Sequence, residues 1–180
     1  NGAFSTEKAK ALLEDTAYQN TVLDNVIETM QRKGYLALDV DFEFIPYDYG
    51  EEYLNFLRNA RQRLSANGFT LSVALAPKTY ANQPGLLYEA HNYPAIGQIA
   101  NRVLLMTYEW GYTYGPPMAV APLPQVEDVV RYAVSVIARN KIYMGIPNYG
   151  YDWTLPYERG TSRADGIGNE EAVQRAARYG

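Results

Sequence analysis

The sequence predicts an α/β fold in which parallel strands alternate with helices. Apolar residues recur at helical spacing in several segments of the chain, which is the pattern of half-buried helices. Short runs rich in β-branched and aromatic residues lie between these segments and are bounded by Gly, Pro or Asn-Gly. The composition, with 47% hydrophobic and 20% charged residues over 180 positions, is that of a folded globular chain.

The first predicted elements are two helices and a strand. Ser5 can cap a helix that runs through Leu13, because its hydroxyl can accept a backbone N–H of the first turn. Apolar residues between positions 22 and 30 share one face of a second helix, and Gly34 ends it. Residues 35–44 then alternate by twos, which predicts a strand.

The rest of the chain repeats this alternation. Parallel strands joined by helices form βαβ units, and no composition shift or long linker divides them, so we expect one structural unit. The predicted order is a helix with apolar positions over 53–64, strand 69–76, helix 93–100, strand 102–108, a Gly/Pro-rich loop at 111–117, helix 126–137, strand 141–146 and a last helix capped by Asn169, with an apolar face at Ala172, Val173, Ala176 and Ala177. Four strands cannot close an eight-stranded barrel of roughly 250 residues, so the sheet is either open or part of a barrel.

Composition excludes several functions. Sixteen basic and 20 acidic residues give a formal net charge of -4, so nucleic acids and anionic membranes are poor partners. We expect no membrane span, and the first ten residues lack the pattern of a signal peptide. The chain has no cysteine and one histidine, His91, which we expect to be structural. We therefore expect carboxylates and tyrosines to be the reactive side chains. The 17 tyrosines have rings with a polar hydroxyl, which suit contacts with sugars.

Three acidic residues at a spacing of two, Asp39, Asp41 and Glu43, form the most informative motif. On a strand they share one face, and repulsion among them raises at least one carboxyl pKa, as a general acid near neutral pH requires. Glu43 comes last, at the carboxyl end where parallel sheets place their ligands. A solvated strand face and a divalent-metal site are the alternative interpretations of the same motif.

Residues 34–43, together with Met106-Thr107-Tyr108-Glu109, resemble glycoside hydrolase family 18, the chitinase-like TIM barrels. Within that family the chain resembles the spore cortex-lytic and germination hydrolases, which are often joined to LysM modules. Segments that carry this resemblance are Leu75-Ala76-Pro77-Lys78-Thr79, Tyr88-Glu89-Ala90-His91-Asn92-Tyr93, the stretch from Leu105 to Gly111 and the stretch from Gly145 to Trp153.

The resemblance implies that residues 1–180 are a partial catalytic barrel holding strands four to seven. Strands one to three and strand eight, with its usual tryptophan, would be absent from this chain. Leu36 stands at the position of the first aspartate of the family signature, whereas the last three acidic positions are kept. Two open sheet edges would favour self-association.

The resemblance also implies a retaining, substrate-assisted cleavage of glycans that contain β-linked N-acetylglucosamine, such as cortex peptidoglycan or chitin. Glu43 would be the general acid, Asp41 would bind the acetamido nitrogen, Asp39 would tune Asp41, and Tyr108 would hold the acetamido oxygen. Further substrate contacts are expected from Met106, Glu109, Trp110, Tyr149 and Trp153.

No metal or cofactor is expected for this reaction, and the family implies a secreted or spore-envelope location. A binding module without catalysis is the alternative function, although retention of Glu43 favours an enzyme. Lys78, at a strand end, could pair either with the carboxylates or with an acidic group of the substrate.

Overall fold

The computed structural model describes residues 4–179, which form two compact units. The first comprises residues 4–106 and 129–143, and the second comprises residues 107–128 and 144–179. The sequence did not indicate this division. Each unit is built from stretches that are separated in the sequence, so no linker or change in composition marks the boundary between them.

A four-stranded sheet dominates the first unit. Its strands are β1 (Ala37–Val40), β2 (Thr70–Leu75), β3 (Arg102–Leu105) and β4 (Ile142–Met144), and they neighbour one another in that order. β1 pairs in parallel with β2, and β2 pairs in parallel with β3. Strands that follow one another without reversal resemble part of a barrel wall, since a doubly wound sheet reverses its order. The described residues form no closed barrel.

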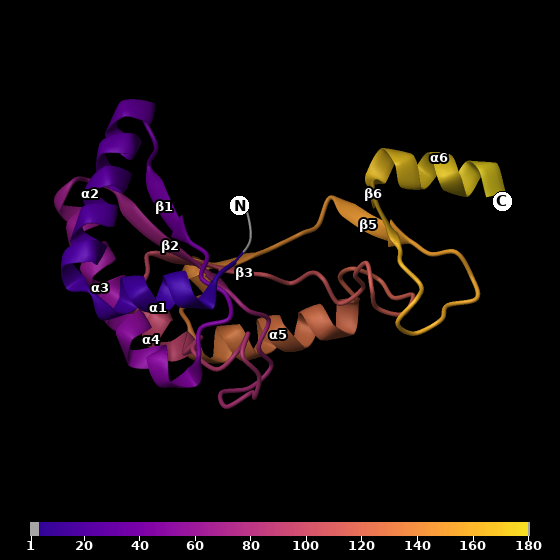
Figure 1. Cartoon of the computed structure of the whole chain (residues 1–180), viewed down its shortest axis with the longest axis horizontal. Coiled ribbons are helices and arrows are strands. Elements are labelled where there is room, and N and C mark those ends of the chain that lie inside the picture. Colours follow the sequence, from indigo (N-terminus) through magenta and orange to yellow (C-terminus); the bar gives the residue numbers. More distant parts are fainter. Residues whose placement is uncertain (1–3, 180) are drawn as a thin grey trace. The chain divides into compact units, whose positions relative to one another are not determined.

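Helices join these strands, as expected (Figure 1). They are α1 (Thr6–Glu14), α2 (Thr16–Lys33), α3 (Gly50–Ala66), α4 (Tyr93–Ile99) and α5 (Leu123–Val136), with 3₁₀ turns at Tyr47–Tyr49 and Arg139–Lys141. The predicted cap is confirmed, because the Ser5 hydroxyl accepts the amide of Lys8, and Gly34 ends α2 at a φ of 70°. Within residues 4–179, no helix is both long and apolar enough to cross a membrane.

The core of the first unit lies between α3 and the sheet. α3 packs against β2 and α4, and it buries the apolar positions that its sequence period predicts. β2 is buried along most of its length, with Leu71, Val73 and Leu75 fully inaccessible to solvent. A near-continuous apolar run is typical of a strand covered on both faces.

The predicted strands are too long. β1 ends at Val40 rather than at residue 44, and β3 ends at Leu105 rather than at residue 108. Beyond β1, the carbonyl of Phe42 meets a histidine ring instead of a strand, and Phe44 takes a positive φ of 57° that breaks the extended backbone. The period-two pattern continues past the point at which hydrogen bonding between strands stops.

The second unit contains a small sheet that the sequence did not predict. β5 (Tyr149–Asp152) pairs antiparallel with β6 (Asp165–Gly168), and α6 (Asn169–Tyr179) packs on both strands (Figure 1). Two of the four residues of β6 are glycine, which has low strand propensity. The apolar face expected for α6 is not buried, since Val173 is 70% exposed.

Candidate active site

The three signature carboxyl groups lie at the carboxyl end of β1. Asp39 is within the strand, opposite Ser72 of β2, while Asp41 and Glu43 follow directly after the strand ends. The sequence predicted that Glu43 lies on the strand. In the structure it lies on the loop beyond β1. Exposure alternates only as far as Asp41: Asp39 and Asp41 are exposed and Val40 is buried, whereas Phe42 and Glu43 are both half-buried.

Burial and mutual repulsion favour the protonated forms of two of these groups. Partial burial, with the negative charge of Asp39 as a smaller cause, raises the pKa of Asp41. Partial burial, followed by the charge of Asp41, raises the pKa of Glu43. A carboxyl group whose pKa lies above its ordinary value can both donate and accept a proton nearer neutral pH.

Asp41 and Glu43 border a hollow of about 360 Å³ in the first unit. Its other walls come from the start of the chain and from α1 and α2, and they are largely apolar. The lining residues are Phe4, Ser5, Lys8, Ala9, Leu12, Tyr18, Val22, Asp41, Phe42 and Glu43. A mainly apolar wall beside two carboxyl groups explains their partial desolvation.

Aromatic stacking holds Phe42, the residue between Asp41 and Glu43. The Phe42 ring stacks on Phe56 and on Tyr53 of α3, with centroids 5.4 and 5.8 Å apart. Tyr53 is fully buried, and its burial, reinforced by the charges of Asp41 and Asp39, raises the pKa of its hydroxyl. That hydroxyl therefore remains protonated, and it has no hydrogen-bond partner among the described residues.

His91 is structural, as expected, and is only 1% exposed. Its Nδ1 lies 2.8 Å from the amide nitrogen of Ala76, and its Nε2 lies 3.0 Å from the carbonyl oxygen of Phe42. Burial lowers the pKa of His91 to about 4; the hydrogen bond to the Phe42 carbonyl raises this pKa in part, and the neighbouring Lys78 lowers it further. At neutral pH the imidazole is therefore uncharged.

Lys78 and Tyr93 complete this buried polar group. The Lys78 ammonium donates to the carbonyl of His91 at 3.2 Å, and burial lowers the pKa of Lys78. The hydroxyl of Tyr93 donates to the carbonyl of Ala76 at 2.6 Å and accepts the amide of Lys78 at 3.1 Å. Lys78 is 2% exposed, and its side chain links the loop after β2 to the backbone of His91. The sequence had suggested two other roles, pairing with the signature carboxylates or with an acidic group of the substrate.

Several predicted substrate contacts lie in the second unit. Tyr108 is half-buried, and Glu109, next to it, has a positive φ of 67°. Such a conformation is costly for a residue other than glycine and is found most often at functional sites. The Glu109 carboxylate accepts hydrogen bonds from the hydroxyls of Tyr149 and Tyr151, at 2.6 and 2.7 Å.

The hydrogen bonds to Glu109 help to keep the hydroxyls of Tyr149 and Tyr151 protonated. Burial, assisted by the carboxylate of Glu109, raises the pKa of Tyr151 to about 12 and raises that of Tyr149 as well. Both phenols thus stay protonated and hold Glu109 in place. Glu109 bridges two parts of the second unit, and its carboxylate is already engaged.

The remaining tryptophans and Met106 lie in different surroundings. Trp153 donates its indole N–H to the carbonyl of Gly115 at 2.9 Å and lies 6.0 Å from the Tyr151 ring, while Trp110 is half-buried. Met106 follows β3 in the first unit and is 8% exposed, which is the burial of a core residue. Their roles in substrate binding stay predictions.

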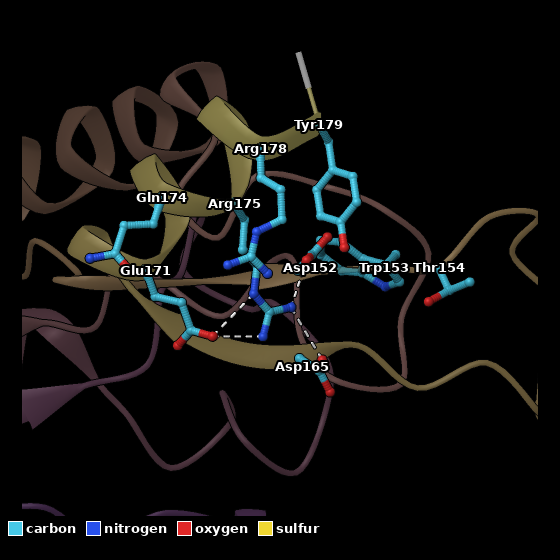
Figure 2. A pocket seen from close by; sticks show the side chains of 9 residues that line it. All are labelled: Asp152, Trp153, Thr154, Asp165, Glu171, Gln174, Arg175, Arg178 and Tyr179. Atoms are coloured by element: carbon cyan, nitrogen blue, oxygen red, sulfur yellow. Dashed lines mark hydrogen bonds and ion pairs between the residues drawn. The ribbon is translucent and has the colours of Figure 1, made fainter.

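A second hollow, of about 660 Å³, lies in the second unit between β5 and α6 (Figure 2). Arg175 reaches from α6 to the carboxylates of Glu171, Asp152 and Asp165, at 2.6, 2.7 and 3.3 Å. Trp153 is the only predicted site residue in its lining, which otherwise includes Arg178 and Tyr179. Arg175 was not predicted from the sequence, because two of its three partners, Asp152 and Asp165, come together only through the unpredicted β5–β6 pairing.

Over residues 4–179, no group of three or more His, Cys, Asp or Glu side chains is arranged to hold a metal ion. Asp39, Asp41 and Glu43 therefore do not converge as ligands, although they are adjacent along one segment. This geometry does not support the metal-site interpretation of the motif.

The model of the family described as glycosyl hydrolases family 18 matches residues 2–178. A cortical fragment-lytic enzyme of Bacillus subtilis is 45% identical over 96% of the chain, and one of Bacillus cereus is 42% identical over 99%. The chain covers 40% and 41% of those two proteins, so it spans about two-fifths of their length.

Solved structures agree with the family match. The spore cortex-lytic enzyme SleL of Bacillus megaterium has a TM-score of 0.93 and 48% identity, with 99% of this chain and 41% of that one covered. A chitinase of Chromobacterium violaceum has a TM-score of 0.88 and 26% identity, with 99% and 54% covered. With its parallel sheet and signature acids, the chain belongs to glycosyl hydrolase family 18.

Proposed function

We propose that residues 1–180 form part of the catalytic barrel of a glycosidase that cleaves β-linked N-acetylglucosamine in the peptidoglycan of the spore cortex. The observation that carries this proposal is the place of Glu43, with Asp41 and Asp39, at the carboxyl end of β1, where burial and the charge of Asp41 raise the pKa of Glu43. The similarity to cortical fragment-lytic enzymes supports cortex glycan over chitin as the substrate, and supports a location in the spore envelope or outside the cell.

The proposed reaction retains the anomeric configuration and uses the substrate's own acetamido group. The acetamido oxygen forms a bond to the anomeric carbon while the glycosidic bond breaks, and Glu43 gives its proton to the leaving oxygen. Water then attacks the same carbon, gives its proton to the Glu43 carboxylate, and reopens the oxazolinium ring. One carboxyl group thus serves as acid and then as base, which suits a pKa above the ordinary value.

The other residues would act on the acetamido group and the sugar rings. Asp41 would accept the acetamido N–H and offset positive charge on the cyclic intermediate, with the charge of Asp39 beside it. Tyr108 would hold the acetamido oxygen in line for attack, which limits the orientations that the substrate samples. Trp110, Trp153, Tyr149, Glu109 and Met106 are the proposed contacts to the sugar chain.

A pair of substrates tests this function. N-acetylated glycan from spore cortex, or chitotetraose, is compared with the same glycan after removal of the acetyl groups, and the anomer formed first is recorded by proton NMR. We expect cleavage of the acetylated glycan only, with the β-anomer as first product. Cleavage of both glycans, or an α-anomer, would overturn the mechanism. Sugar binding without cleavage would instead indicate the binding module.

A further inference from the structure

A buried histidine joins the ends of two neighbouring strands in the first unit. His91 precedes α4, yet its ring contacts Ala76, directly after β2, and Phe42, just beyond β1. These contacts span 15 and 49 positions of the chain. The loop that carries the signature acids is thereby tied to the loop after β2.

The hydrogen bonds define which ring nitrogen carries the proton. The backbone amide of Ala76 can only donate, so Nδ1 of His91 accepts it. The carbonyl of Phe42 can only accept, so Nε2 carries the proton and donates it. Both ring nitrogens are used in the neutral form, and a second proton on Nδ1 would face the amide of Ala76.

Phe42 is held at its side chain as well as at its carbonyl. Its ring lies against Tyr53 and Phe56, and Tyr53 in turn stacks on the His91 ring with centroids 6.0 Å apart. Phe42 lies between Asp41 and Glu43, beyond the last residue of β1. The direction of its backbone therefore decides where both carboxyl groups point.

We infer that His91 is a positioning residue for Glu43 and Asp41, acting through its hydrogen bond to the carbonyl of Phe42. Its catalytic consequence rests on the proposed function, whereas its effect on Glu43 can be measured without substrate. The groups that face the imidazole are Lys78, whose ammonium is bound to the His91 carbonyl, and the Tyr53 ring.

Two substitutions separate the two hydrogen bonds. In His91→Gln the amide nitrogen can reach the position of Nε2 and still donate to Phe42. In His91→Asn the side-chain oxygen can take the position of Nδ1 and accept from Ala76, while the bond to Phe42 is lost. Both variants are compared with the wild type in the native protein that carries residues 1–180.

Three quantities are measured: the melting temperature, the carboxyl titration of Glu43 by carbon NMR, and kcat and KM on N-acetylated glycan. We expect His91→Gln to keep the Glu43 titration, and His91→Asn to shift it and to lower kcat about tenfold or more with little change in KM. Equal Glu43 titrations and equal kcat in the two variants would overturn the inference. An inactive wild type would refute the proposed function alone, because the Glu43 titration still tests positioning.

A measurement on the wild type covers the case in which neither variant folds. Nitrogen NMR of the imidazole reports the tautomer of His91 directly. We expect the proton on Nε2 and a scalar coupling through the hydrogen bond to the carbonyl carbon of Phe42. A proton on Nδ1, or the absence of that coupling, would refute the positioning role.

Discussion

At the residue scale, spacing along the sequence was sufficient to find the signature acids. Asp39, Asp41 and Glu43 follow one another at intervals of two, although exposure alternates only from Asp39 to Asp41. The polar groups beneath them could not be found in this way. His91, Lys78 and Tyr93 are brought to the strand ends by the fold, and burial, which lowers or raises their pKa values, is not visible in sequence.

Glu109 offers a test of the polar cluster in the second unit. Replacing Glu109 by Gln removes the negative charge that both tyrosine hydroxyls face, so we expect the pKa of Tyr151 to fall from about 12 toward its ordinary value of 10.0. Carbon NMR of the phenol ring measures this titration. An unchanged pKa of Tyr151 in the variant would show that burial alone sets it.

At the element scale, the helices were predicted better than the strands. The face of α3 and the Ser5 cap of α1 match because helical period and capping are local properties. The ends of β1 and β3 depend on where pairing with a neighbour stops, and the β5–β6 pair joins segments with weak strand propensity. Both features depend on contacts between residues that are distant in sequence. The hydrophobic periodicity of a single sequence does not report such contacts.

The packing of α4 against residues after α5 can be tested with one methyl group. A Cβ on Gly97 would lie 2.8 Å from a side-chain carbon of Ile137, so we expect Gly97→Ala to lower the free energy of unfolding by about 1–3 kcal/mol. Gly50→Ala, at the start of α3, is the matched control, because its Cβ would meet nothing within 4 Å. Urea unfolding measures both. Equal stability of the two variants would contradict this packing.

At the scale of the whole molecule, the sequence identified the fold class and the family but not the division into two units. βαβ alternation predicted the parallel sheet, and the strand order β1-β2-β3-β4 agrees with a barrel wall. Each of the two units combines stretches that are distant in sequence, so no change in amino-acid composition along the chain marks their boundary.

The buried His91 makes stability depend on pH. Its pKa of about 4 lies below the ordinary 6.5, so the unfolded chain binds more protons between these values, and stability falls as pH decreases through that range. The loss amounts to roughly 3 kcal/mol by pH 4. Asp41 and Glu43 act in the opposite sense, because their raised pKa values favour the folded state toward acid pH.

The contribution of His91 is isolated by comparing the wild type with His91→Gln. Urea unfolding at pH 7, 5.5 and 4 should show a steeper loss of stability in the wild type than in the variant. Identical pH dependence of the two proteins would mean that the imidazole is not held neutral in the folded state.

The sheet edges lead to an expectation about association. β1 and β4 are the outer strands of the four-stranded sheet, and an outer strand exposes backbone groups that can pair with another chain. We therefore expect the 180-residue chain to self-associate, which light scattering coupled to size-exclusion chromatography measures. A monodisperse monomer that melts cooperatively would contradict this.

The proposed role of Glu43 as acid and base of a glycosidase is tested most directly by hydrolysis with wild type and Glu43→Gln, with sugar binding recorded in the same samples. Glu28→Gln, on the exposed face of α2, is the matched control. We predict that Glu43→Gln loses about 100-fold or more of the hydrolysis rate while it still binds sugar, and that Glu28→Gln cleaves like the wild type. Hydrolysis by Glu43→Gln at the wild-type rate would contradict this role of Glu43.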